Sequence, residues 1–298
     1  MIINRGNLTG LTTGFRTNFQ NAFDGVTPTW PRVATLVSSN TAAEEYPWLG
    51  AFPRMRKWVG DRVVKNLAAN GYRIVNEKFE DTVGVKRDSI EDDQFGVYKP
   101  MFEGLGRAVA EFPDELVYAK LAKGFTENCY DGQFFFDTDH PVINPATGQA
   151  ESVSNMQAGV GAPWFLLDTT KAMRPLILQE RQKARFTSLD NPNDDHVFKK
   201  DEFIYGADCR YGVGFGFWQM AFGSKAALST ANFDAARLAM ENVKSDEGVK
   251  LGIRPTLLVI GSSNEAAAEA ILLKQNLAGG ESNVNYKRVE ILKVSWLD

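Results

Sequence analysis

The chain has few of the residues on which catalysis and metal binding most often depend. Among its 298 residues are 2 histidines and 2 cysteines, which is little material for a catalytic triad or a multi-histidine metal site. Cys129 and Cys209 lie far apart in the sequence and form no CxxC pair, as is typical of free thiols in a reducing cytoplasm. These shortages disfavour metalloproteins and triad hydrolases.

Long charged runs and long apolar runs are also missing. No run of Lys and Arg exceeds two residues and the net charge is −4, which disfavours specific nucleic-acid recognition. No apolar stretch approaches the ~20 residues that span a bilayer, and the first residues do not form a secretion signal. With 44% hydrophobic and 23% charged residues, the composition is that of a globular protein with one large or two small domains.

Apolar side chains recur every three or four positions near the N-terminus and predict one face of a helix. They are Leu8, Leu11, Phe15, Phe19 and Phe23. Two interpretations are open: an amphipathic helix on its own core, or an arm that docks this face on a neighbouring subunit. Residues 24–47 carry three prolines and show no clear period. They favour the arm, because long irregular connections are uncommon inside a compact domain.

The next segment predicts a short helix over residues 53–67 and then a hairpin. Apolar and polar residues alternate over 72–74 and again over 79–85, so we expect two strands of one hairpin. A strand pair that buries little is marginal in water. A solvated edge hairpin and an extended loop lying over a neighbour therefore remain as alternatives. At its base, Glu91, Asp92 and Asp93 could bind a divalent ion or pair with a neighbour's Arg, but a solvated charge run is commoner.

The rest of the chain predicts a long helix, a strand-rich middle and a small α+β unit. Residues 101–123 would span ~35 Å as one kinked helix or two abutting ones, since Pro113 interrupts the pattern. In the strand-rich residues 160–223, glycines alternate with apolar residues from 212 to 217, which leaves one strand face bare for close backbone approach. A helix over 232–244 and a buried strand over 256–260 predict the last unit.

The most pointed chemical pattern is Cys129 followed by DGQFFFDTDHP, which ends at His140 and Pro141. A cysteine near a histidine suggests acyl transfer, yet no oxyanion-hole motif flanks the cysteine. Asp137, Asp139 and His140 suggest a metal site, but aspartates spaced by two also occur in ordinary polar turns. We therefore expect a structural loop, with no catalytic residue, no cofactor and no metal.

Several long strings in the sequence resemble one known family. They include EEYPWLGAFPRMRKWVGDRVV, RDSIEDDQFGVYKPMFEGLGRA, CYDGQFFFDTDHP and FIYGADCRYGVGFGFWQMAFGS. These strings resemble the Mu-like phage major head subunit family, the T protein of the head. The match runs in order from about Asn4 to Trp296. The family is similar in fold to the tailed-phage capsid proteins of the Hong Kong ninety-seven type, which implies an α+β fold.

The resemblance also implies a division of the chain. Residues 1–50 would be an N-terminal arm and 51–100 an extended loop with a flanking helix, its hairpin at about 70–97. Residues 101–229 would be a peripheral domain with a spine helix, and 230–285 an axial domain. Residues 286–298 would supply the C-terminal strand of the peripheral domain.

The resemblance implies that the protein has a mechanical function, which is to enclose DNA in a virion. Subunits made in the host cytoplasm would form hexamers and pentamers of an icosahedral shell around double-stranded DNA, bound without sequence specificity. Partners would be a portal, a decoration protein and a separate scaffolding protein, because no long scaffolding segment is evident ahead of the arm; no membrane is involved. The contacts between subunits are expected at Leu11, Phe15, Phe19, Phe23, Lys78, Phe79, Glu80, Glu91, Asp92 and Asp93. Alternatives are a nanocompartment shell and a small hydrolase using Cys129 and His140.

Overall fold

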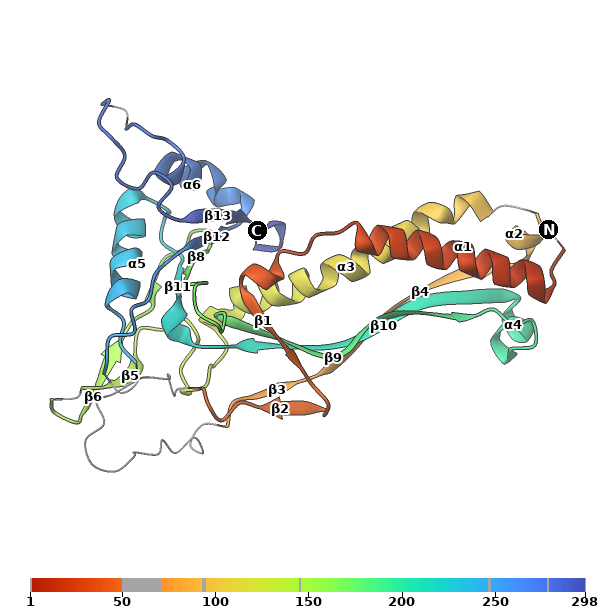
Figure 1. Cartoon of the computed structure of the whole chain (residues 1–298), viewed down its shortest axis with the longest axis horizontal. Helices are drawn as coiled ribbons and strands as arrows, with labels where there is room; N and C mark the ends of the chain where they lie inside the picture. Colours follow the sequence, from red (N-terminus) through yellow and green to blue (C-terminus); the bar gives the residue numbers. More distant parts are fainter. Residues whose placement is uncertain are drawn as a thin grey trace.

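The computed structural model has an elongated half and a compact half (Figure 1). In the elongated half, helices α1 and α3 lie along a sheet of long strands, and the N-terminus is at its far tip. The compact half contains helices α5 and α6, and the C-terminus lies between the two halves. The structure describes residues 2–49, 71–92, 95–144, 146–245, 248–277 and 279–297. The helix expected over 53–67 lies outside these residues.

Helices and strands both contribute substantially, as an α+β fold requires. The helices are α1 (Arg5–Asp24), α2 (Arg87–Glu91), α3 (Lys99–Ala122), α4 (Asp195–Lys200), α5 (Thr230–Asn242) and α6 (Glu265–Leu272). The first strands are β1 (Ala34–Ser38), β2 (Ala43–Glu45), β3 (Arg73–Val75), β4 (Glu77–Lys86), β5 (His140–Ile143), β6 (Ala150–Val153) and β7 (Met156–Gln157). The later strands are β8 (Trp164–Leu167), β9 (Leu176–Leu189), β10 (Glu202–Phe215), β11 (Ala221–Ser224), β12 (Leu257–Ile260) and β13 (Glu290–Lys293).

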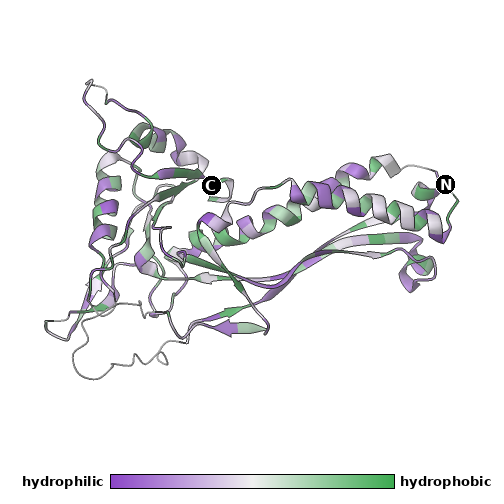
Figure 2. Ribbon diagram, viewed as in Figure 1, coloured by the Kyte–Doolittle hydropathy of each residue, from purple (hydrophilic) through white to green (hydrophobic). Residues whose placement is uncertain are grey.

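The elongated half is a four-stranded sheet, in the order β1-β9-β10-β4, covered on one face by α1 and α3. The helix α1 begins after Asn4, whose side chain accepts a hydrogen bond from the Asn7 backbone N–H at 2.9 Å. The expected long helix is confirmed as α3, a single helix that continues through Pro113. Both helices are amphipathic (Figure 2), so their apolar sides can cover the sheet while the polar sides face water.

The two helices touch most closely at Gly106. A Cβ atom added there would collide with the backbone carbonyl of Phe19 on α1. Gly104, two positions earlier on the same helix, faces open space. The missing side chain at Gly106 is therefore what lets α1 and α3 approach each other at this point.

The compact half is built on a five-stranded sheet in the order β13-β12-β8-β11-β7. The apolar run over 256–260 forms β12, whose four residues are all buried, as expected of a strand covered on both faces. The last strand differs from the expected division. Residues 286–298 were assigned to the peripheral domain, whereas β13 pairs in parallel with β12 and so shares the sheet of the compact half.

The hairpin expected at about 70–97 is wrong in its pairing. Both strands exist, but β3 pairs with β2, and β4 pairs along its whole length with β10. Only Asn76 separates β3 from β4, which leaves no turn between them. The bare glycine face of β10 explains the arrangement, because Cβ atoms at Gly212 and Gly214 would collide with the β3 segment. The close backbone approach predicted for these glycines is confirmed at Gly212, which faces the Val75 carbonyl, whereas Gly214 makes room for the Ile74 side chain.

Candidate assembly surfaces and the Cys129–His140 cluster

The apolar face of α1 is bound to its own chain. Phe15 and Phe19 are each 3% exposed, and Phe15 stacks on Phe102 of α3 with ring centroids 4.1 Å apart. Leu11 and Phe23 are half-buried at the margin of the same cluster. In this structure the partners of Phe15 and Phe19 are α3 and the sheet of the same subunit, as in the alternative of an amphipathic helix on its own core.

Strand β4 places the expected contact residues on an open edge. Among the strands that the structure describes, β4 has one partner in its sheet, β10, so its other edge has no strand partner there. Lys78 and Glu80 are exposed, while Phe79 is half-buried against Phe112 of α3, with ring centroids 4.7 Å apart. These three residues are available at the surface in the way that an intersubunit contact requires.

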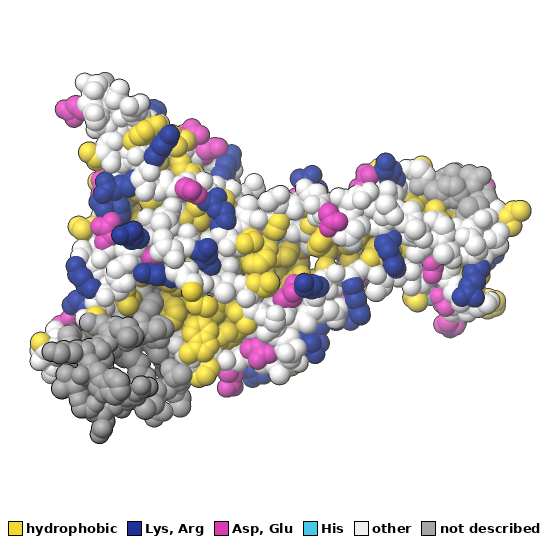
Figure 3. Space-filling model, viewed as in Figure 1, with side chains coloured by type: hydrophobic (Ala, Val, Ile, Leu, Met, Phe, Trp, Pro, Cys, Tyr) yellow, Lys and Arg dark blue, Asp and Glu magenta, His cyan; other side chains and the backbone are white. Residues whose placement is uncertain are grey.

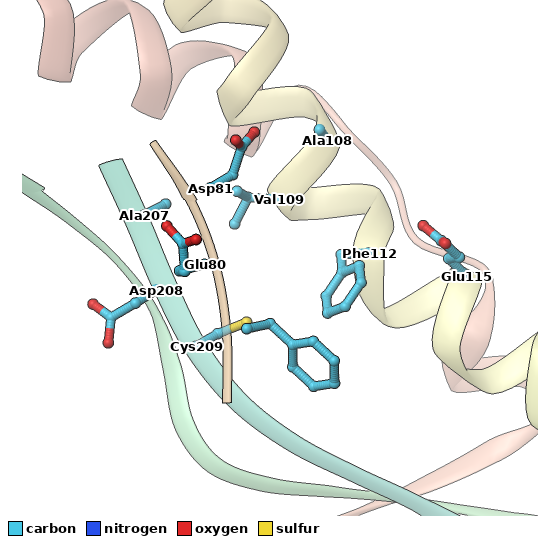
Figure 4. Close-up of a pocket in the computed structure, with 10 residues that line it drawn as sticks. Glu80, Asp81, Ala108, Val109, Phe112, Glu115, Ala207, Asp208 and Cys209 are labelled. Carbon is cyan, nitrogen blue, oxygen red and sulfur yellow. The ribbon is translucent and has the colours of Figure 1, made fainter. Parts of the chain in front are cut away.

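A groove runs between this edge and α3 (Figure 4). Its floor is apolar and includes Val109, Phe112 and Cys209, and the Phe112 ring reaches from α3 toward the strands. Glu80, Asp81, Glu115 and Asp208 also line it, and the carboxylate of Asp208 points away from α3 (Figure 4). Sequence reasoning had found Phe79 and Glu80 of this groove. It missed the α3 and β10 residues, because they join β4 only through the tertiary fold.

The Asp208 carboxylate already has a partner. The Arg185 guanidinium lies 2.7 Å from Asp208, and their hydrogen bond holds the pKa of that carboxyl below its usual range.

The acidic run at residues 91–93 lies partly at the solvent-exposed surface. Glu91 lies 3.2 Å from Arg87 and Asp92 is exposed, whereas Asp93 lies outside the described residues.

Apolar side chains also gather on the molecule's surface. On the face shown in Figure 3 they lie together where the compact half meets the elongated half, with Lys and Arg spread over the compact half. At the opposite end of the fold, Phe198 of α4 is 85% exposed. Contiguous apolar patches on soluble proteins mark contacts with other macromolecules. The surface as a whole is therefore suited to association.

Cys129 and His140 come together in the fold with Asp131 between them. The Cys129 thiol donates to Asp131 Oδ1 at 3.0 Å, and His140 Nδ1 lies 2.7 Å from Asp131 Oδ2. No hydrogen bond joins the sulfur to the ring among the described residues. Burial raises the pKa of the Cys129 thiol far above its usual range, so the thiol keeps its proton at neutral pH. A cysteine in this state is a poor nucleophile.

The fold does not bring together the metal-site candidate that the sequence suggested, Asp137, Asp139 and His140. Asp137 accepts from the backbone N–H groups of Phe134 and Thr138, as in a polar turn, and a hydrogen bond with Asp137 raises the pKa of Asp139. In the described part of the chain, the residues that cluster with metal-ligand spacing are Cys129, Asp131 and His140. Asp131, which the sequence pattern includes without giving it a particular role, contacts both of the others.

The comparisons with known proteins agree along the whole chain. The Mu-like prophage major head subunit gpT family matches residues 8–297. The major capsid protein of Escherichia phage Mu is 40% identical over 290 residues, which cover 96% of this chain and 95% of that protein. The Mu-like prophage FluMu major head subunit of Haemophilus influenzae is 42% identical over 271 residues, 89% of this chain and 88% of the relative.

Solved capsids give the same fold. The procapsid of bacteriophage JBD30 superposes with a TM-score of 0.87 at 47% identity, covering 99% of this chain and 100% of that one. The JBD30 capsid gives a TM-score of 0.79 at 36% identity, with 100% of both chains covered. The expected tailed-phage capsid fold is thereby confirmed. No helix within the described ranges is long and apolar enough to cross a membrane. The chain belongs to the Mu-like prophage major head subunit gpT family, whose members are structural subunits of a phage capsid.

Proposed function

We propose that this chain assembles through hexamers and pentamers into an icosahedral phage head that encloses double-stranded DNA, and that it catalyses no reaction. The observation that carries the proposal is the full-length likeness to the JBD30 procapsid subunit. The nanocompartment alternative is not favoured, because the family match is to phage head subunits. The hydrolase alternative is not favoured either, because the buried Cys129 thiol keeps its proton and donates a hydrogen bond to Asp131, not to His140.

The elongated shape of the subunit supports heterologous assembly, in which one surface of a subunit contacts a different surface of its neighbour. Heterologous contacts close into rings when the rotation between subunits allows it. On this chain the open edge of β4 and the groove beside α3 form one such surface. We propose that a neighbouring copy covers it, with Lys78, Phe79 and Glu80 in the contact. Leu11, Phe23, Glu91 and Asp92 would lie at its outskirts.

The two halves suggest a division of labour in the shell. We propose that the elongated half, with α3 as the spine helix, is the peripheral domain and that the compact half, β13 included, is the axial domain around capsomer centres. The β2–β3 pair would then form the base of the extended loop. A fitted map with the compact half away from the five-fold and six-fold axes would refute this assignment.

Other partners follow from the proposed role. A portal and a separate scaffolding protein would join during assembly, and a decoration protein afterwards; a JBD30 capsid has been solved decorated with minor capsid protein trimers. DNA would meet the shell without sequence readout, which suits a chain of net charge −4.

The assembly surface is tested by reversing its charges. Glu80→Lys and Lys78→Glu alter exposed side chains, so the protomer should fold normally while particle yield falls at least several-fold. Lys183→Glu, an exposed change on β9 outside the groove, serves as the matched control and should assemble like the wild type. Normal particles from both β4 variants would remove β4 from the contact without touching the capsid assignment.

A further inference from the structure

His140 is a fully buried histidine whose two ring nitrogens both face oxygen atoms. Its exposed fraction is 0%. Nδ1 lies 2.7 Å from Asp131 Oδ2, and Nε2 lies 3.2 Å from Asn155 Oδ1. A neutral imidazole has one N–H donor and one bare nitrogen, so it can satisfy only one of two acceptors. The protonation state of His140 therefore depends on whether these two atoms are true acceptors.

The orientation of Asn155 is decided by its surroundings. Its Nδ2 donates to the carbonyl of Phe135 at 2.8 Å and also faces the carbonyls of Trp218 and Ala221. Its Oδ1 accepts the backbone N–H of Asp137 at 2.9 Å. Rotating the amide by half a turn would set the NH₂ group against that N–H and the oxygen against three carbonyls. The atom facing His140 Nε2 is thus an acceptor.

Asp131 is likewise an acceptor, because its surroundings favour the carboxylate. Oδ1 accepts the Cys129 thiol at 3.0 Å and the Gln133 backbone N–H at 3.1 Å. Burial alone would raise the pKa of Asp131, but its interactions with His140, Cys129 and the Gln133 backbone N–H together lower it. The proton between Asp131 and His140 consequently belongs to the ring.

The remaining neighbour of the ring also suits a cation. The His140 ring stacks on the indole of Trp218, with centroids 4.0 Å apart and planes 7° from parallel. An aromatic face attracts a positive charge, and most strongly so when water is excluded. Trp218 belongs to the short turn before β11, so this contact joins the loop to the sheet of the compact half.

We propose that His140 is an imidazolium protonated on both ring nitrogens, and that its ion pair with Asp131 is a buried lock that holds residues 126–139 against β10 and β11. Phe135 of this loop stacks on Phe215 of β10 with centroids 4.4 Å apart, and its neighbour Phe136 packs on Gly223 of β11. The lock gives the Cys129–His140 motif a structural purpose that needs no catalysis. It is independent of the proposed shell function.

A metal ion is the rival explanation, since Cys129, Asp131 and His140 have metal-ligand spacing. The distance between His140 Nδ1 and Asp131 Oδ2 argues against it. At 2.7 Å the two atoms are at the separation of a charge-assisted hydrogen bond. Two ligands of a tetrahedral zinc ion, each about 2 Å from the metal, stand roughly 3.3 Å apart.

The protonation state is read by solid-state NMR on assembled particles labelled with ¹⁵N-histidine. The chain has 2 histidines, and His196→Gln assigns the signals. We expect both ring nitrogens of His140 to be directly bonded to hydrogen at pH 7. A single protonated nitrogen would overturn the proposal. So would one equivalent of bound zinc per chain, measured by elemental analysis, whose removal by a chelator lowers the melting temperature.

The lock itself is tested with Asp131→Asn, His140→Gln and the double variant, using the full-length chain. Each single change leaves a buried group without its partner, so we expect the melting temperature to fall by roughly 6–15 °C. The melting temperature of the double variant should fall by clearly less than the two single-variant losses added together, because the two residues are coupled. His196→Gln, the same change at a partly exposed histidine, should shift the melting temperature by less than about 2 °C. Additive losses, or losses no larger than the control's, would contradict the lock.

Discussion

Phe15 on α1 and Phe102 on α3 stack with their ring centroids 4.1 Å apart and their planes 22° from parallel. Tyr205 of β10 meets both rings edge-on, at 5.2 Å and 5.4 Å. This three-ring contact binds the N-terminal helix to the spine of its own subunit. The first 24 residues are thus part of the protomer's core, which changes what their removal should do.

Phe15→Ala should destabilise the protomer and not only its assembly. Truncating a buried phenylalanine costs about 3–5 kcal/mol, through lost burial and the cavity left behind. Urea unfolding of the unassembled protein measures this loss. Thr17→Ala, on the exposed side of the same helix, should change stability by less than about 0.5 kcal/mol. A fully stable Phe15→Ala protomer that fails to form shells would restore the docking-arm interpretation.

The approach of α1 to α3 gives a paired test on two glycines. Gly106→Ala places a methyl group against the Phe19 carbonyl and should cost about 1–3 kcal/mol. Gly104→Ala faces open space on the same helix and should stabilise by roughly 0.5–1 kcal/mol. Denaturant midpoints of the two variants should therefore move in opposite directions. Equal shifts would show that α1 does not pack on α3 in solution.

The two cysteines should be unreactive in the folded chain. Burial raises the pKa of Cys209 to about 11 and that of Cys129 further, so little thiolate exists at pH 8. A thiol reagent should label both residues only after denaturation. Fast labelling of native Cys129 at pH 8 would revive the nucleophile hypothesis.

Acid should weaken the Asp131–His140 pair. Because the folded-state pKa of Asp131 is lowered from 3.8, the pair contributes stability above that pH and loses it as the pH falls further. The stability difference between wild type and Asp131→Asn should therefore shrink as the pH falls below about 4. Urea midpoints between pH 5 and pH 3 measure this change, and a difference that stays constant or grows below pH 4 would contradict the assignment.

Periodicity predicted the elements of this fold better than their partners. The spacing of Phe15 and Phe19 predicts a helix face, but the spacing is the same whether that face meets its own sheet or a neighbour. Alternation over 72–74 and 79–85 likewise predicts β3 and β4. It carries no information on pairing, which here depends on the bare face at Gly212 and Gly214 of β10.

The site residues show the same limit. Cys129 and His140 were recognised as neighbours because one short loop carries both. That Asp131 would hydrogen-bond to each, and that Asn155 would complete the ring's surroundings, depends on how the loop folds onto β10 and β11. The groove beside α3 has the same origin, since β4, α3 and β10 meet only in three dimensions.

Particle mass and shape test the central claim most directly. Purified protein, with a scaffolding protein present, is measured by light scattering and negative-stain microscopy. The account predicts closed icosahedral shells, or stable rings of five and six subunits on the way to them. A sharp monomer or dimer at every concentration, unchanged by scaffolding protein, would contradict it.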